Sequence, residues 1–259
     1  MTRTRLHRAH DRIDAGRLPT LGEYDLIRGL TGIGAYLLHR RSRTLLRDVL
    51  TYLVRVTQPL RTEGHIVPGW WTANAPTDTP SPRWPGGHAN LGLAHGITGP
   101  LALLALTFRA GIAVPGHDTA IDRICHWLDR WQISRGPTAR WPEAISAAEH
   151  KAGVTRRSRP GRPSWCYGTP GIVRAQQLAA IATDDRARQR RAERALTGCL
   201  NDPRQLDQLT DASLCHGWAG LLHTTSRVAA DAEDADIFAT PRLAYPTLQQ
   251  QRRPRRDPG

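Results

Sequence analysis

A short glycine-containing pattern occurs four times along this chain, and it restricts the possible folds more than any other feature of the sequence. In each copy two glycines, three residues apart, stand at the start of a largely apolar segment. The four copies are DLIRGLTG (25–32), GLAHGITG (92–99), SWCYGTPG (164–171) and SLCHGWAG (213–220). Self-similarity of this kind is typical of architectures in which one helical unit packs against the next.

Apolar residues recur at helical spacing after each copy, and a second helical segment follows each of the first three. The sequence predicts seven helices, at residues 25–40, 43–57, 94–111, 117–133, 168–182, 185–201 and 216–231. No run of alternating apolar and polar residues predicts a strand. We therefore predict an all-α protein, a ring of helical hairpins whose inner helices point their N-terminal ends at one cavity.

The glycines themselves need a structural reason. The residue four positions before the first glycine is Asp25, Gly92, Ser164 or Ser213, and all four are types favoured at helix N-caps. This register would place the glycines in the first two helical turns, where each costs about 1 kcal/mol relative to alanine. Close approach of the helix N-termini around a common centre would explain why glycine is used there.

Irregular segments at residues 58–93 and 134–167 interrupt the helical pattern. The first is rich in Pro, Gly and Thr and is too long for a simple turn, which indicates either function or disorder. We interpret its three tryptophans, Trp70, Trp71 and Trp84, as packing residues rather than ligand contacts. We expect one incomplete toroid domain over residues 1–245 and a disordered basic tail over 246–259, where periodicity is absent.

The formal net charge of +13 suggests an anionic partner. The basic residues are almost all arginine, with Lys151 the only lysine, and their clusters are scattered along the sequence. This composition does not favour nucleic-acid binding, and an acidic peptide partner fits the charge equally well. A structural zinc protein with a nucleic-acid-binding surface stays as a weaker alternative.

The sequence shows no N-terminal apolar run and no stretch of about 18 apolar residues, so we expect neither a signal peptide nor a membrane span. Its four cysteines are too few for a disulfide framework in a chain of 259 residues. We therefore predict a cytoplasmic protein with reduced thiols.

Two of the cysteines stand at the same register of the repeat. If the four motifs converge, Cys166, Cys215 and His216 come together, and two thiols and one imidazole suit zinc with its fourth position open. A buried cysteine is more often a small core residue, which explains Cys125 and Cys199 well. On the residues alone, His95 is equally explained as a core histidine, Asp25 as a helix cap and Arg162 as a surface arginine.

Three stretches, GLAHGITGP, SWCYGTPG and CHGWAG, resemble those of the lanthionine synthetase C-like proteins, the cyclases of lantibiotic biosynthesis. The Cys-Tyr-Gly and Cys-His-Gly pair, with the Ala-His-Gly motif upstream, is highly specific in this order. The resemblance covers roughly residues 22–222. It implies an α/α toroid, a nested helical barrel of helical hairpins, and a single zinc ion as cofactor.

The resemblance also implies roles for seven residues. It implies that the metal ligands are Cys166, Cys215 and His216. The family's catalytic positions match Asp25, His95, Arg162 and Tyr167. All seven positions hold the expected residue type, which favours the catalytic interpretation of Asp25 and Arg162 over the structural one.

The implied reaction is the addition of a peptide cysteine thiol to dehydroalanine or dehydrobutyrine, which forms a thioether ring in a lanthipeptide. Its implied partners are a dehydrated precursor peptide with a leader and a separate lantibiotic dehydratase. His95 is the candidate proton donor, because histidine ordinarily titrates near neutral pH. Arg162 is expected to stabilise enolate charge or to anchor Asp25, Asp25 to orient His95 or Arg162, and Tyr167 to position a hydrogen bond.

The sequence departs from the family at both ends. Family members are longer, Asp25 stands close to the N-terminus, and no further Gly-x-x-Gly motif follows Gly220. We therefore expect an incomplete ring, truncated at both ends. The alternative function is that of a non-catalytic relative that binds the precursor peptide or a dehydratase.

Overall fold

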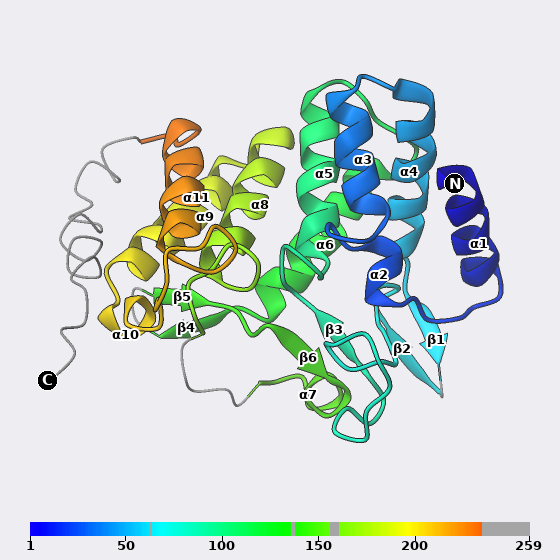
Figure 1. Ribbon diagram of the computed structural model, residues 1–259, viewed down its shortest axis with the longest axis horizontal. Coiled ribbons are helices and arrows are strands. Elements are labelled where there is room, and N and C mark those ends of the chain that lie inside the picture. Colours follow the sequence, from blue (N-terminus) through cyan, green and yellow to red (C-terminus); the bar gives the residue numbers. More distant parts are fainter. Residues whose placement is uncertain (63, 136–137, 156–160, 235–259) are drawn as a thin grey trace, which may run out of the picture.

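The structure is a computed structural model that describes residues 1–62, 64–135, 138–155 and 161–234. Helices dominate it, and the short strands lie together along one side of the helices (Figure 1). The helices are α1 (Thr2–Asp14), α2 (Leu21–Tyr24), α3 (Leu30–His39), α4 (Arg43–Val56), α5 (Thr98–Arg109), α6 (His117–Arg130), α7 (Ala147–Ala152), α8 (Thr169–Ala182), α9 (Arg186–Leu200), α10 (Pro203–Leu206) and α11 (Trp218–Ala230).

The four helices that follow the repeated motifs pack in series. Helix α3 contacts α5, α5 contacts α8, and α8 contacts α11. The first three are each paired with the next long helix along the chain, so that α3–α4, α5–α6 and α8–α9 are helical hairpins. This is the arrangement that the repeat predicts.

Burial differs along the series of motif helices. Helix α8 buries almost every residue from Thr169 to Ala180, because α5, α9 and α11 surround it. Helix α3 buries four of its ten residues and leaves Tyr36 exposed, and α11 leaves Leu222 exposed. Helices α5 and α8 thus form the interior of the protein, whereas α4 is amphipathic with one face in solvent.

Each repeated motif is a tight turn before its helix, which corrects the predicted register. The first glycine is the N-cap residue of α3, α8 and α11 rather than a residue of the helix interior. The second glycine touches its own turn: a Cβ at Gly171 would lie 2.1 Å from the carbonyl oxygen of Trp165, and one at Gly220 2.1 Å from that of Leu214. Close approach therefore explains these glycines, but within each copy.

Three two-stranded antiparallel sheets accompany the helices, and no sequence pattern predicted them. Their strands are β1 (Leu60–Thr62) with β2 (His65–Val67), β3 (His88–Asn90) with β6 (Ala144–Ser146), and β4 (Ile133–Arg135) with β5 (Thr138–Arg140). Each strand has three residues, too few for an alternating pattern to be visible. They order the segments that the sequence left irregular, and Trp70 and Trp71, each 1% exposed, pack in the core as predicted.

The predicted helices are confirmed with small shifts of their ends, except that the helix predicted at 25–40 begins only at Leu30. Residues 25–29 form the turn between α2 and α3. Helix α1 was not predicted; it buries Leu6 and Ala9, and Arg12 forms an ion pair with Glu23 at 2.7 Å. The predicted basic tail, 246–259, lies outside the described residues. None of the described helices is long and apolar enough to cross a membrane.

Candidate metal and proton-transfer site

Backbone hydrogen bonds link the four turns into one chain of contacts. The Leu26 N–H donates to the Ala94 carbonyl at 3.0 Å, and the Leu93 N–H donates to the Cys166 carbonyl at 2.9 Å. The Cys166 N–H donates in turn to the Cys215 carbonyl at 3.3 Å. Because these residues stand two or three positions before the first glycine of each copy, equivalent parts of the four motifs converge on one centre.

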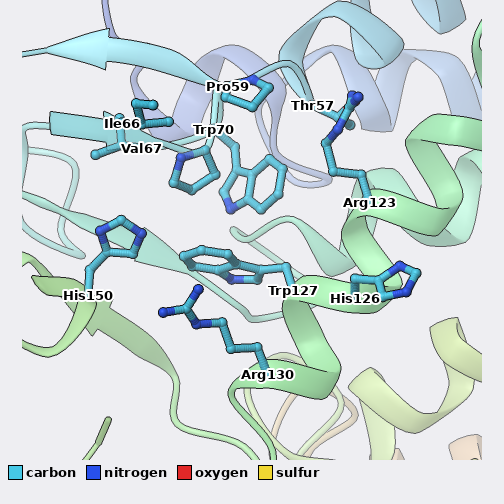
Figure 2. Close-up of a pocket in the computed structure, with 11 residues that line it drawn as sticks. Thr57, Pro59, Ile66, Val67, Trp70, Arg123, His126, Trp127, Arg130 and His150 are labelled. Atoms are coloured by element: carbon cyan, nitrogen blue, oxygen red, sulfur yellow. The ribbon is translucent and has the colours of Figure 1, made fainter. Parts of the chain in front are cut away.

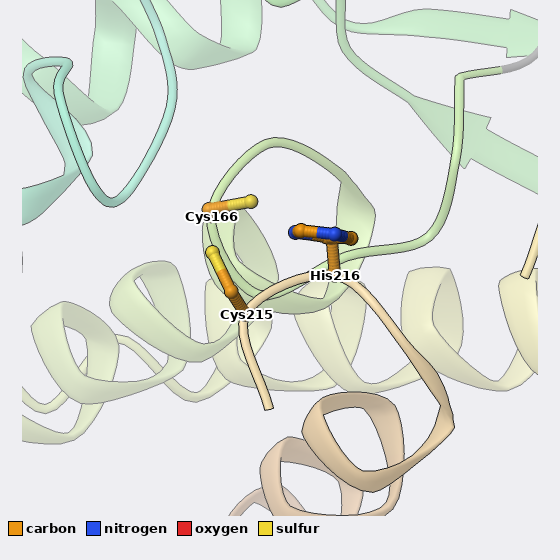
Figure 3. Close-up of side chains that lie close together, drawn as sticks. All are labelled: Cys166, Cys215 and His216. Carbon is orange, nitrogen blue, oxygen red and sulfur yellow. The ribbon is translucent and has the colours of Figure 1, made fainter. Parts of the chain in front are cut away.

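The convergence brings Cys166, Cys215 and His216 together. One ligand atom from each, the two Sγ atoms and a ring nitrogen, lie within 4.8 Å of one another. Figure 3 shows the three side chains pointing toward a common point from the turns that precede α8 and α11. The predicted set is therefore close enough for its atoms to share one metal ion after small side-chain adjustments.

The chemistry of this donor set suits a cation. Cys166 is buried, and its thiol lies 3.6 Å from the Ser164 hydroxyl, whereas Cys215 is exposed. Partial burial and the neighbouring Cys166 raise the pKa of the Cys215 thiol to about 11, and the positive charge of Arg162 opposes this shift. Without a cation the Cys215 thiol stays protonated at neutral pH, whereas Zn²⁺ stabilises thiolates and accepts imidazole nitrogen.

A buried carboxylate holds the imidazole of the second motif. Asp25 is fully buried, and its Oδ2 lies 2.7 Å from Nδ1 of His95. Its Oδ1 accepts the backbone N–H groups of Arg28 and Gly29 at 2.6 and 2.7 Å. The carboxylate therefore holds both the backbone of the first repeated turn and the His95 ring. The other ring nitrogen of His95, Nε2, points away from the carboxylate.

Tyr167 lies between the imidazole and the metal cluster. Its ring centroid is 6.1 Å from that of His95, and the residue directly follows Cys166. The Asn90 side chain donates to the Tyr167 hydroxyl at 3.3 Å. Burial raises the pKa of Tyr167 above its ordinary value, an effect that the Asn90 hydrogen bond partly offsets, so this hydroxyl stays protonated at neutral pH.

Arg162 faces the metal side of the site. Its charge lowers the pKa of both Cys215 and Asp211, and no hydrogen bond or ion pair joins its side chain to Asp25 among the described residues. Arg28 is the arginine that lies beside Asp25, with Nε 3.6 Å from Oδ2. Arg162 therefore makes no contact with Asp25 among the described residues, and its two expected roles, stabilising charge or anchoring Asp25, stay predictions.

Sequence reasoning missed two neighbours of the site, Asn90 and Asp211. Asp211 places Oδ2 3.7 Å from Nε2 of His216 and accepts the Ser213 N–H at 2.7 Å. The register of the repeat could have found both, because Asn90, Arg162 and Asp211 all stand six residues before the first glycine. A third neighbour, Arg28, directly precedes Gly29 and shares its register with His95, Tyr167 and His216.

Comparisons with known proteins show the family and the fold of this chain. The family model described as lanthionine synthetase C-like protein matches residues 3–243. The chain is 28% identical to the nisin biosynthesis protein NisC of Lactococcus lactis subsp. lactis over 208 residues, which are 79% of this chain and 49% of that protein. It therefore spans about half the length of this curated relative.

A solved structure of nisin cyclase superposes with a TM-score of 0.76 at 24% identity, over 90% of this chain and 58% of that one. This likeness confirms the predicted α-toroid fold, here without a closed ring among the described residues. With the family model matching most of the sequence, the chain belongs to the lanthionine synthetase C-like family.

Proposed function

We propose that this protein is a zinc-dependent lanthionine cyclase. It would add cysteine thiols of a dehydrated precursor peptide to dehydroalanine or dehydrobutyrine residues and so form thioether rings. One observation carries the proposal. A Cys166, Cys215 and His216 cluster suited to zinc lies on the same series of hydrogen-bonded turns as the Asp25–His95 pair. The first group suits thiol activation and the second suits proton transfer.

Cys166, Cys215 and His216 would hold the ion through three protein atoms, so that a peptide thiol could bind it as a further ligand. Zinc, when bound, lowers the pKa of a coordinated thiol and so supplies a thiolate nucleophile. The protein positions its own ligands through the turns, since the Ser213 hydroxyl accepts the His216 N–H at 3.3 Å and Cys166 bonds to the Cys215 carbonyl. The exposed Cys215 lies on the side from which a peptide enters.

His95 would act as the general base and then as the general acid. With Nδ1 held by Asp25, Nε2 is the nitrogen that can accept the proton of the peptide thiol and return it to the α-carbon of the dehydro residue. The sulfur forms a bond to the β-carbon, the π bond between the α- and β-carbons is lost, and the transferred proton completes the thioether. Asp25 keeps the ring in the required tautomer and stabilises its charged form.

Arg162 and Tyr167 would act on the charge that develops on the peptide. The carbonyl next to the α-carbon gains negative charge as the sulfur adds, and a guanidinium near Cys215 stabilises it. Tyr167 is a neutral hydrogen-bond donor between His95 and the cluster. It would orient the dehydro residue between the thiol and the imidazole.

The test is to incubate the zinc-loaded protein with a precursor peptide that a separate dehydratase has already dehydrated. Ring formation leaves the peptide mass unchanged, so free thiols are counted by mass spectrometry after alkylation. Loss of alkylatable thiols supports cyclisation. Binding of zinc and peptide with all thiols still free would instead identify a non-catalytic relative that binds the precursor.

A further inference from the structure

A basic surface with two cavities lies outside the site formed by the four turns. A cavity of about 430 Å³ separates strand β2 and the segment after it from helix α6, and a second of about 480 Å³ lies between β2 and helix α7. Both are lined by Ile66, Val67 and His150, so they form one elongated groove along β2. We call this groove the tryptophan groove, and it contains none of the residues of the metal and proton-transfer site.

Two tryptophans form the floor of the first cavity. The rings of Trp70 and Trp127 pack edge to face with centroids 5.6 Å apart, and His150 lies 5.5 Å from Trp127 (Figure 2). On the rim Ile66 is 58% exposed, a high value for a large aliphatic side chain beside an aromatic surface. Such a floor with polar groups at its edge is typical of a binding site for side chains with apolar bodies.

The charge around the groove has one sign. Arg123 and Arg130 reach along its α6 side (Figure 2), Lys151 lines the α7 side, and none of the described lining residues is acidic. Arg123 donates to the Thr57 hydroxyl at 3.0 Å, and the Arg130 guanidinium lies 5.5 Å from the centroid of the Trp131 ring. Within the described chain neither arginine has a carboxylate oxygen within 4.0 Å.

The acidic residues of α6 and α7 have other partners. Asp118 accepts the Thr119 N–H at 2.7 Å, and Asp122 lies 3.0 Å from His126. Asp129 pairs with Arg188 at 2.8 Å, and Glu149 caps the start of α7 through Ser146. The groove therefore has two uncompensated guanidinium groups beside a tryptophan floor. Carboxylates are the complementary charge, and a chain long enough to occupy both cavities is the complementary shape.

We propose that the tryptophan groove binds an extended acidic peptide segment, one in which Asp or Glu residues alternate with aliphatic or aromatic residues. Carboxylates pair with Arg123 and Arg130 while apolar side chains rest on the partly exposed Trp127, which the buried Trp70 supports from below. The proposal rests on the proposed function in one respect: the segment is taken to belong to the precursor peptide, outside the residues that form rings. The groove would then hold the substrate while its cysteines reach the zinc cluster.

The experiment measures binding of a fluorescein-labelled peptide, Gly-Glu-Leu-Asp-Phe-Glu-Leu-Gly, by fluorescence anisotropy. Wild-type protein is expected to bind it, with affinity falling steeply as salt rises. Arg123→Glu together with Arg130→Glu should weaken binding by at least about tenfold. Arg191→Glu together with Arg194→Glu, two exposed residues of α9 that make the same change in net charge, should alter it by less than about twofold.

A second variant protects the test against misfolding, because Arg130 also contacts Trp131. Ile66→Asp changes an exposed residue of the groove and should weaken the same peptide by about fivefold or more. The peptide with Gln and Asn in place of its acidic residues should bind at least about tenfold more weakly. Equal loss in the control pair, equal binding of the neutral peptide, or equal displacement by a short DNA strand would overturn the proposal.

The two proposals fail separately. Cys215→Ala removes a metal ligand but none of the groove, so it should leave peptide affinity unchanged while cyclisation stops. With a full-length dehydrated precursor, the Arg123 and Arg130 double variant should raise KM by about tenfold with kcat unchanged. A lower kcat at unchanged KM, or absent peptide binding in an active wild-type enzyme, would remove the groove from substrate recognition.

Discussion

The first two turns of the repeat and the last two use one backbone for different chemistry. The first two bring together Asp25 and His95, held by a 2.7 Å hydrogen bond and by two backbone N–H groups on the carboxylate. The last two bring together Cys166, Cys215 and His216, where the raised pKa of Cys215 leaves its thiol protonated at neutral pH. The protein alone orders the first pair, whereas the second group needs a cation to become a ligand set.

This difference means that the two groups can be disrupted independently. Changing a residue in the last two turns should affect metal content first and reaction second. Changing a residue in the first two turns should affect the reaction alone. Variants of Cys215, His95 and Asp25 test whether the metal cluster and the Asp25–His95 pair are independent.

The largest effect is expected for Cys215→Ala. Loss of one of three protein ligands should reduce bound zinc from about one ion per chain to below about a tenth and abolish cyclisation. Zinc is measured by metal analysis after dialysis, and cyclisation by counting free thiols in the peptide. Full zinc occupancy in this variant would remove Cys215 from the ligand set.

His95→Asn should leave zinc content unchanged and slow ring closure by about 10²- to 10⁴-fold, the usual contribution of a positioned acid or base. The amide can still hydrogen-bond to Asp25 but cannot carry the proton. Rates are taken under single-turnover conditions, so that product release does not mask the step. Zinc loss in this variant would contradict the independence of the two groups, and a wild-type rate would exclude His95 from proton transfer.

Asp25→Asn should slow the reaction less, by about ten- to a hundredfold, because His95 remains but its tautomer and charged form lose their support. Zinc content should again be unchanged. Asp118→Asn, an exposed carboxylate in the first turn of α6, is the control and should have the wild-type rate. If both substitutions slowed the reaction equally, a general loss of charge or stability would be the cause.

Metal-free protein offers a fourth test through the Cys215 thiol. Its pKa is raised from 9.0 to about 11. At about pH 8 its alkylation by iodoacetamide should therefore be about tenfold slower than that of an ordinary thiol, and it should accelerate as the pH rises toward the pKa. The raised pKa stabilises the metal-free fold fully below the unfolded value of 9.0, and this contribution is lost as the pH rises through about 11. Fast alkylation at neutral pH would show that the thiolate is already stabilised without metal.

Much of this site could be predicted from sequence because the repeat fixes register. Equivalent positions in equivalent turns must meet when the turns converge, so the placement of Cys166 beside Cys215 and His216 follows from the repeat. Asp25 was predicted as a helix cap or as a site residue. The N-cap of α3 is Gly29 instead, and the Asp25 carboxylate accepts N–H groups of the turn before that helix and contacts His95. Arg28, only three residues from that carboxylate, takes the position beside it that was one of two expectations for Arg162.

The features that the sequence could not predict lie outside the four repeated motifs. The strands have three residues each and pair across up to 58 positions, as β3 does with β6, so a local sequence pattern does not predict them. Helix α1 consists mostly of charged and polar residues, so its sequence shows no clear apolar face. Its apolar residues Leu6 and Ala9 are buried because α1 packs against α3 and α4, which the local sequence does not reveal. The tryptophan groove depends on the same long-range pairings and was equally invisible.

The smallest effect is expected for Cys125→Ala. This cysteine is 2% exposed on the core side of α6, and burial raises the pKa of its thiol to about 12, so it is neither a nucleophile nor a ligand in the fold. The substitution removes one sulfur from the core and should lower the free energy of unfolding by about 1 kcal/mol. Zinc content and cyclisation rate should be those of the wild type, which is checked by metal analysis and denaturant unfolding. Loss of zinc in the Cys125→Ala variant would mean that burial does not distinguish structural from metal-binding cysteines in this chain. It would then also contradict the assignment of metal binding to the last two turns alone.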